Sequence, residues 1–179
     1  KTYDMGQHGF ARDMEFTLES QTENEIWFVL HSNEETYAKY PYVFTLKLGY
    51  RLTGTKVDVL WHVENLSDEE MPFAIGGHPA FCCPINKTEK QSDCYLKFDV
   101  AGPIESETID GYLVGDKTQS YDLKDGKIRI DEHMFDNDAL IFAKQGIKKA
   151  ALCNAKGEAY LTIEMDAPLF GVWRPADPS

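Results

Sequence analysis

Two of the five histidines in this 179-residue chain stand in short segments whose neighbours restrict the backbone. His8 lies between Gly6 and Gly9 in "GQHGFARD", and His78 follows two glycines and precedes Pro79 in "AIGGHPAFCCPI". Glycine can take a positive φ and permits close backbone approach, whereas proline favours an extended residue before it. Imidazole has an ordinary pKa of about 6.5, so a histidine with a fixed direction can donate and regain a proton near neutral pH. Acid–base catalysis is one interpretation of these segments, and a structural hydrogen bond is the other.

The remaining histidines are His31, His62 and His133. His62 lies on the polar face of a predicted strand, His31 ends another strand, and His133 falls in a predicted helical turn. For all of them we expect a solvated or structural role.

The four cysteines do not have the spacing of a metal site. Cys82 and Cys83 are adjacent, so they are poorly placed to bridge each other, and no CxxC pair involves Cys94 or Cys153. A zinc site built from His78 and the first three cysteines would lack standard ligand spacing, and a cupin-like site would need a His-x-His that the sequence does not contain. We therefore expect reduced thiols, a cytoplasmic location, no metal and no cofactor.

The elements that must position these groups are strands. Apolar and polar residues alternate over 43–52 and 56–65, with a short glycine-bearing loop at 53–55, which predicts a β-hairpin. Further strands are predicted at 14–20, 24–32, 94–100, 120–123, 127–130, 139–144, 149–154 and 159–165.

Helix signals are few: one or two turns at 33–40 and one turn at 131–135, capped by Asp131. Many short antiparallel strands predict one all-β domain over residues 1–179, an antiparallel β-sandwich with less than about a tenth of its residues in α-helix.

The composition excludes several classes of partner. The net charge is -12 and no run of lysine or arginine could form a basic face, so we expect neither nucleic acid nor an anionic membrane surface as a partner. No stretch approaches the roughly 18 apolar residues of a membrane-spanning helix.

Three segments together carry a resemblance to a known family: "HGFARD", "MPFAIGGHPAF" and "PLFGVWRP". In this order along the chain they resemble the aldose 1-epimerase (galactose mutarotase-like) family, particularly its LacX-type branch. The resemblance implies a galactose mutarotase-like supersandwich whose concave face binds a hexose or hexose phosphate, with no metal or cofactor.

The resemblance also implies roles for individual residues. His78 would be the general acid and His8 its partner in an isomerase that opens the sugar ring and interconverts its anomers. Arg12, Asp138 and Trp173 would bind the substrate. Each of these three also has an ordinary alternative: a surface ion pair of the arginine with a neighbouring carboxylate, a loop-capping aspartate, and a tryptophan packed in the core.

The chain departs from the family pattern at the residue that serves as the general base. The family's general base is a glutamate in a motif like "CIEPW" after the tryptophan that matches Trp173, whereas the sequence ends at "RPADPS". Glu164 is no substitute, because it precedes Trp173. We therefore expect the chain to span only the middle of the family's domain, an incomplete sandwich with doubtful activity of its own that could self-associate through exposed sheet edges. The alternative function is that of a non-catalytic carbohydrate-binding protein.

Overall fold

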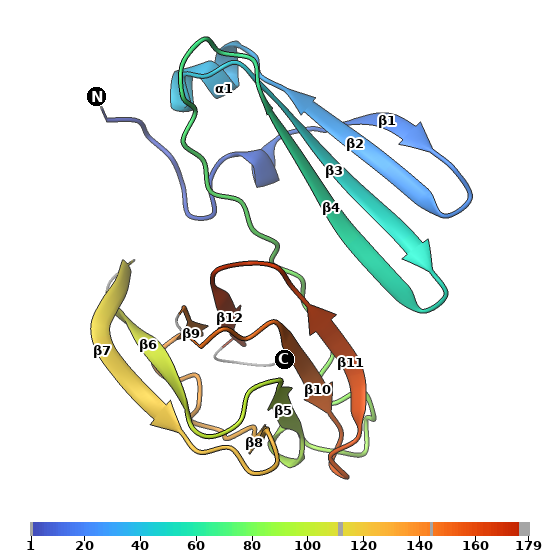
Figure 1. The fold of residues 1–179 in the computed structure, drawn as a ribbon, viewed down its shortest axis with the longest axis vertical. Helices are drawn as coiled ribbons and strands as arrows, with labels where there is room; N and C mark the ends of the chain where they lie inside the picture. Colours follow the sequence, from blue (N-terminus) through green and yellow to red (C-terminus); the bar gives the residue numbers. More distant parts are fainter. Residues whose placement is uncertain (1, 111–112, 144, 176–179) are drawn as a thin grey trace. The chain divides into compact units, whose positions relative to one another are not determined.

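The computed structural model describes residues 2–110, 113–143 and 145–175, and its regular elements are almost all antiparallel strands (Figure 1). The described residues contain one six-residue α-helix, α1 (Glu34–Lys39), and two three-residue 3-10 turns, η1 (Ala11–Asp13) and η2 (Gln91–Asp93). The strands are β1 (Thr17–Gln21), β2 (Glu25–His31), β3 (Phe44–Thr53), β4 (Lys56–Asn65), β5 (Tyr95–Phe98), β6 (Ile104–Asp110), β7 (Leu113–Tyr121), β8 (Lys127–Arg129), β9 (Leu140–Phe142), β10 (Lys149–Cys153), β11 (Ala159–Glu164) and β12 (Phe170–Val172). The predicted all-β antiparallel fold is confirmed.

The chain forms two compact units, Lys1–Gly77 and His78–Ser179. Each unit has its own buried apolar cluster. The boundary falls inside the "GGHPAF" segment, between the second glycine and the histidine.

The first unit is one four-stranded antiparallel sheet in the order β1-β2-β3-β4. The alternation of β3 and β4 places their apolar residues on the same face, because Leu46 pairs with Val63 and Leu48 with Trp61. At one end of that face, residues of the N-terminal segment and the loops cover the apolar surface. The cluster there consists of buried Leu30, Phe44, Leu46 and Met71 and the half-buried Phe10, Ala11, Met14, Phe16, Tyr40, Tyr42, Leu48 and Val63.

The other end of the same face is open. Large apolar side chains there are between 42% and 57% exposed, namely Leu18, Tyr50, Leu52, Val57, Val59 and Trp61. We call these six residues the open apolar face.

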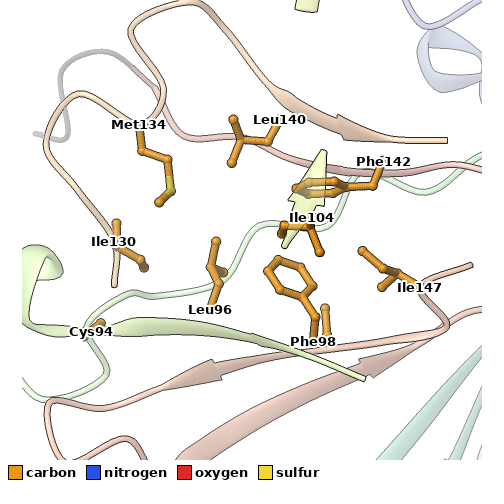
Figure 2. Close-up of a cluster of buried hydrophobic side chains, with 10 residues drawn as sticks. Cys94, Leu96, Phe98, Ile104, Ile130, Met134, Leu140, Phe142 and Ile147 are labelled. Carbon is orange, nitrogen blue, oxygen red and sulfur yellow. The ribbon is translucent and has the colours of Figure 1, made fainter. Parts of the chain in front are cut away.

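The second unit is a β-sandwich of two four-stranded sheets, β11-β10-β5-β8 and β12-β9-β6-β7. Their facing side chains form one core, and Figure 2 shows Phe98 and Ile104 pointing toward Phe142 from different strands. The ring of Phe98 meets that of Phe142 edge-on at 5.5 Å, and the Phe142 ring is stacked on that of Phe170 at 6.3 Å. The Phe98–Phe142 contact joins the two sheets, whereas Phe142 and Phe170 are partners in neighbouring strands of one sheet.

Polar side chains also hold the β12-β9-β6-β7 sheet together. Ser106 is 2% exposed, and its hydroxyl accepts a hydrogen bond from the backbone N–H of Ile141 at 2.9 Å. The carboxylate of Glu107, 5% exposed, accepts one from the N–H of Ala143 at 3.2 Å. These bonds fix β9 beside β6, where the two strands share one ladder pair.

Most predicted strands are present with shifted ends, and two predictions need correction. Strand β6 and most of β7 were not predicted, and the segment 131–135 forms turns instead of a helix. Asp131 does cap that turn, since its carboxylate accepts a hydrogen bond from the N–H of His133 at 2.8 Å. The helix predicted at 33–40 is confirmed as α1, with Asn33 as its N-cap in a capping box.

Candidate functional site

His8 occupies a turn in the first unit and has an unusual backbone conformation. Its φ is 65° and that of Gly9 is 73°, and the N–H of Gly9 donates to the carbonyl of Gly6 at 3.3 Å. A left-handed conformation costs an L-residue roughly 1–2 kcal/mol, and such outliers cluster at functional sites. The sequence suggested glycine flexibility around the histidine, but the histidine itself bears the strain.

Arg12 follows in η1 of the same unit and is exposed. Its Nε lies 3.3 Å from the Asp13 carboxylate, with the two side chains 60% and 72% exposed. The structure thus contains the surface ion pair that was the alternative interpretation of this arginine. Such a pair is weak, so it leaves the guanidinium available for exchange with another anion.

His78 begins the second unit, in an irregular segment that reaches from the end of β4 to η2. The side chain of His78 is exposed. Gly76, before it, does not take a positive φ, so that part of the sequence argument was wrong.

A tyrosine that the sequence did not single out holds this segment against the sandwich. The hydroxyl of Tyr160, on β11, donates to the carbonyl of Cys82 at 2.8 Å, four residues after His78. Burial raises the pKa of Tyr160, and contact with the Cys83 thiol raises it further, so the phenol stays a donor at neutral pH. Only the position of Tyr160 within a predicted strand was visible in the sequence.

Trp173 is the predicted site residue that meets His78. The imidazole and indole centroids lie 6.0 Å apart with an interplanar angle of 85°, an edge-to-face contact. Trp173 is 50% exposed, so it is not the core residue of the alternative interpretation. An exposed indole beside an exposed imidazole offers an apolar face and a proton donor side by side.

Asp138 lies at the same end of one strand pair as Trp173. In the β9–β12 pairing Val172 stands opposite Leu140, and continuing this antiparallel register brings Trp173 toward the start of β9, which Asp138 precedes. Asp138 is exposed, has a φ of 78°, and its carboxylate accepts a hydrogen bond from the N–H of Ala139 at 2.7 Å. The capping role that was its alternative interpretation is therefore present, at a strained position.

Arg174 fixes the segment that carries Trp173. Its guanidinium donates to the side-chain oxygen of Gln91 at 2.8 Å and to the carbonyl of Glu132, and lies 5.7 Å from the ring centroid of Phe135. Arg174 belongs to the "PLFGVWRP" segment, where its residue type alone suggested no role. The structure identifies it as a positioning residue for its neighbour.

The other candidate groups have structural partners. His31 is hydrogen-bonded to Thr45 at 3.2 Å and His133 to Asp136 at 2.8 Å, and this bond raises the pKa of His133. Glu164 forms an ion pair with Lys149 at 2.7 Å.

Two open hollows of about 480 Å³ each occur in the first unit. One is lined by residues around α1, and the other by Glu19, Ser20, Trp27, Lys47 and His62. Neither contains a predicted site residue. Over residues 2–110, 113–143 and 145–175, no three His, Cys, Asp or Glu side chains are grouped as metal ligands. In the same ranges, no helix has the length and apolar character needed to cross a membrane.

The second unit thus brings His78 and Trp173 into contact and holds Asp138 at the end of the neighbouring strand. His8 and Arg12 belong to the first unit. His8 lies in a turn with a strained backbone, and Arg12 forms a surface ion pair with Asp13. An imidazole, an indole face and a carboxylate are groups that recognise a polar ring with hydroxyls, and the imidazole can exchange protons with it.

Comparison with known proteins shows which family the chain belongs to. The Aldose 1-epimerase family profile matches residues 1–175. Two curated proteins of Lactococcus lactis subsp. lactis, the plasmid and chromosomal forms of protein LacX, are each 32% identical over 169 residues. That match covers 89% of this chain and 55% of the relative's length, so the chain spans about half of these curated relatives.

Solved structures extend the similarity to the fold. A galactose mutarotase related enzyme from Lactobacillus acidophilus matches with a TM-score of 0.87 and 32% identity, over 97% of this chain and 58% of that one. A galactose mutarotase-like protein from Lactobacillus casei matches with a TM-score of 0.82 and 29% identity, over 98% and 61%.

Proposed function

Because the chain belongs to the aldose 1-epimerase family, we propose that it takes part in mutarotation, the interconversion of the α and β anomers of a hexose. The observation that carries the proposal is the contact between His78 and Trp173, two residues of the motifs that resemble the family. We further propose that the two compact units are parts of one family domain, since the matched region runs without interruption across residues 77 and 78.

In the proposed mechanism His78 is the general acid. A base removes the proton from the anomeric O1 while His78 protonates the ring oxygen, so the bond between C1 and that oxygen breaks and an open-chain aldehyde forms. The aldehyde turns about the C1–C2 bond, and both proton transfers reverse as the ring closes on the other face. His8 is the assisting histidine, donating to a sugar oxygen. A positioned acid or base of this kind contributes typically about 10²–10⁴-fold in rate.

Trp173, Asp138 and Arg12 are the proposed substrate-binding residues. The exposed face of the Trp173 indole can stack on the C–H face of a pyranose, and the Asp138 carboxylate can accept from hydroxyls. Arg12 would donate to hydroxyls or, with a hexose phosphate, bind the phosphate with two parallel hydrogen bonds.

We propose that the base is a carboxylate outside residues 1–179. Glu164 is the glutamate closest in sequence before the Trp173 segment, and its pairing with Lys149 supports a structural role for it. The resemblance to the family supports a base that follows Trp173 in sequence. A mutarotase assay would test this, comparing residues 1–179 with the same chain extended by the corresponding segment of a LacX relative.

Binding without turnover is the second candidate function. The half-exposed Trp173 favours it, because a stacking platform retains sugars whether or not a base is present. Isothermal titration with a hexose and polarimetry on the same sample separate the two: binding with no acceleration of mutarotation indicates a carbohydrate-binding protein.

We also propose that the protein is cytoplasmic and that it self-associates through the edge strands of its sheets.

A further inference from the structure

The indole of Trp27 lies flat on the sheet of the first unit. In the ladder between β2 and β3, Trp27 stands opposite Gly49. A Cβ at Gly49 would lie 2.7 Å from each of three indole atoms, Cδ2, Cε2 and Cζ2. These are neighbouring atoms of the six-membered ring, and a point equally far from all of them lies over the face of that ring. The indole therefore covers Gly49 with one face and turns its other face away from the sheet.

Hydrogen bonds fix the ring in this position. The Nε1–H of Trp27 donates to the carboxylate of Glu25 at 2.6 Å, and the same carboxylate accepts from Nε of Arg51 at 2.5 Å. The hydrogen bond from Arg51, and then that from the indole, lower the pKa of Glu25, so the acceptor is charged at neutral pH. Because the half-buried ring is held both at its face and at its edge, it loses little further freedom when a ligand binds.

Polar side chains line a hollow beside this ring. The hollow of about 480 Å³ on this face is bordered by Trp27, Glu19, Ser20, Lys47 and His62, and its volume lies within the range of about 300–1,000 Å³ that is typical of ligand clefts. Ser20 stands opposite Trp27 in the β1–β2 ladder, and His62 stands opposite Lys47 in the β3–β4 ladder. The hollow thus combines an aromatic surface with a carboxylate, a hydroxyl, an ammonium and an imidazole, which include both donors and acceptors.

This combination fits a saccharide ring better than other ligands. A pyranose has C–H groups on one face, which can stack on an indole, and hydroxyls at its rim, which need donors and acceptors. An anion such as a nucleotide would require an unpaired cation, whereas Lys47 forms an ion pair with Glu19 and the chain has a net charge of -12. A wholly apolar ligand would remove the polar rim from water without replacing its hydrogen bonds.

We propose that the hollow beside Trp27 is a saccharide-binding site that takes one pyranose unit stacked on the indole. The proposal goes beyond the proposed function and does not rest on it, because no residue of the proposed mechanism borders the hollow.

The site lies on the opposite side of the first-unit sheet from the segment that carries His8. Phe28, the neighbour of Trp27 in β2, pairs with Leu48 of the apolar cluster, so the Trp27 side chain is on the other face. Phe10, two residues after His8, packs against that apolar cluster. The sheet therefore separates the two positions.

The test titrates the isotope-labelled 179-residue chain with methyl β-D-galactopyranoside, followed by NMR. This glycoside cannot change its anomeric form, so binding is measured without turnover, and its C–H groups at C3, C4 and C5 lie on one face. The chain contains three tryptophans, whose indole N–H signals are assigned by substitution to phenylalanine. We expect a saturable shift of the Trp27 signal, with saturation transfer from the protein strongest at the protons on C3, C4 and C5. No shift of the Trp27 signal would overturn the proposal.

The other two tryptophans make the result specific. The Trp61 side chain is 42% exposed on the opposite face of the same sheet, so its signal should not shift. A shift confined to Trp173 would support the proposed function and overturn this site. A shift of Trp27 with none of Trp173 would support this site and contradict the proposed substrate-binding role of Trp173.

Substitutions test the two parts of the site. Trp27→Ala should weaken binding of the glycoside at least about tenfold, because it removes the stacking surface. His62→Ala, at an exposed rim residue, should weaken it about two- to tenfold, and this variant decides the question if Trp27→Ala does not fold. His133→Ala, in the second unit, is the control that should bind as the wild type does. Affinity is measured from the backbone amide signals of β2, β3 and β4, and an unchanged affinity in either folded variant would overturn the site.

Discussion

His78 and Trp173 lie in ring-to-ring contact, with the edge of one ring directed at the face of the other and the centroids 6.0 Å apart. The contact joins the irregular segment that begins the second unit to the residue that follows its last strand, β12. Since Arg174 anchors that end to Gln91, Glu132 and Phe135, the position of the indole depends on η2 and on the turn at 132–135.

The proposed acid is tested most directly in a chain extended by a LacX-type segment bearing the "EPW"-like motif. There we expect mutarotation of α-glucose or α-galactose, and His78→Ala should slow it by about 10²–10⁴-fold. Polarimetry is the measurement, and His133→Ala is the control that should keep full activity, because the His133 imidazole is bonded to its neighbour Asp136 in a surface turn. Unchanged activity in His78→Ala would assign the acid role to another residue.

Residues 1–179 alone should accelerate mutarotation far less than the extended chain. Without a positioned base the loss is on the order of 10²–10⁴-fold, or roughly 3–5 kcal/mol of barrier. The same polarimetric assay decides this. Full activity of the 179-residue chain would mean that the base lies within it.

Tyr160→Phe should loosen the segment that carries His78. The variant loses the hydrogen bond to the Cys82 carbonyl, worth about 1 kcal/mol, so amides of residues 78–93 should exchange with solvent about fivefold faster. Peptide-level hydrogen exchange measures this. Tyr37→Phe, at a tyrosine that is 53% exposed in the first unit, should leave the exchange of this segment unchanged. Equal exchange in wild type and Tyr160→Phe would show that the bond does not restrain the segment.

The first unit offers a packing test at Gly49. A Cβ at this position would lie 2.7 Å from the Trp27 indole, so Gly49→Ala should displace the ring and destabilise the unit by about 1–3 kcal/mol. Tryptophan fluorescence during urea unfolding follows the change. Gly6→Ala is the matched control, because its Cβ would meet nothing within 4 Å and its φ is not positive. A Gly49→Ala variant as stable as Gly6→Ala would contradict the close ring packing.

The stability of the second unit should depend on pH partly through His133. The hydrogen bond to Asp136, and then its charge, raise the pKa of His133 above the ordinary value. Because the pKa of His133 is higher in the folded state than in the unfolded state, protonated His133 stabilises the fold. This stabilisation is fully present below the unfolded-state pKa and is lost as the pH rises through the folded-state pKa. Because both side chains are mostly exposed, the effect on stability is small, and NMR titration of the imidazole is the better measurement. Asp136→Asn should return the His133 pKa to the ordinary range, and an unchanged titration would contradict the pairing.

Sequence patterns predicted the elements whose two faces differ strongly in polarity. Strands β3 and β4 alternate clearly because one face carries the apolar residues of the first unit. Strand β7 was largely missed because it is an edge strand with both faces mostly exposed. Strand β6 was missed because, after the buried Ile104, it buries the polar residues Ser106 and Glu107. Binary patterning carries no signal in such strands.

The candidate site could be predicted only in part. The motifs identified His78 and Trp173, but their contact depends on tertiary packing. Tyr160 and Arg174 act through partners far away in the chain, Cys82 and Gln91, and no local spacing reveals such pairs. The strained φ of His8 and of Asp138 was likewise invisible, because left-handed backbone is expected at glycine.

The open apolar face of the first unit has a consequence for how the protein behaves at different ionic strengths. Copies of a chain with a net charge of -12 repel one another, and this repulsion opposes contact between exposed faces rich in leucine, valine and tryptophan. Salt shortens the range of the repulsion to about 10 Å at 0.1 M and about 3 Å at 1 M, while the attraction between apolar surfaces persists. The colloidal stability of this protein should therefore fall, and light scattering should rise, as salt is added.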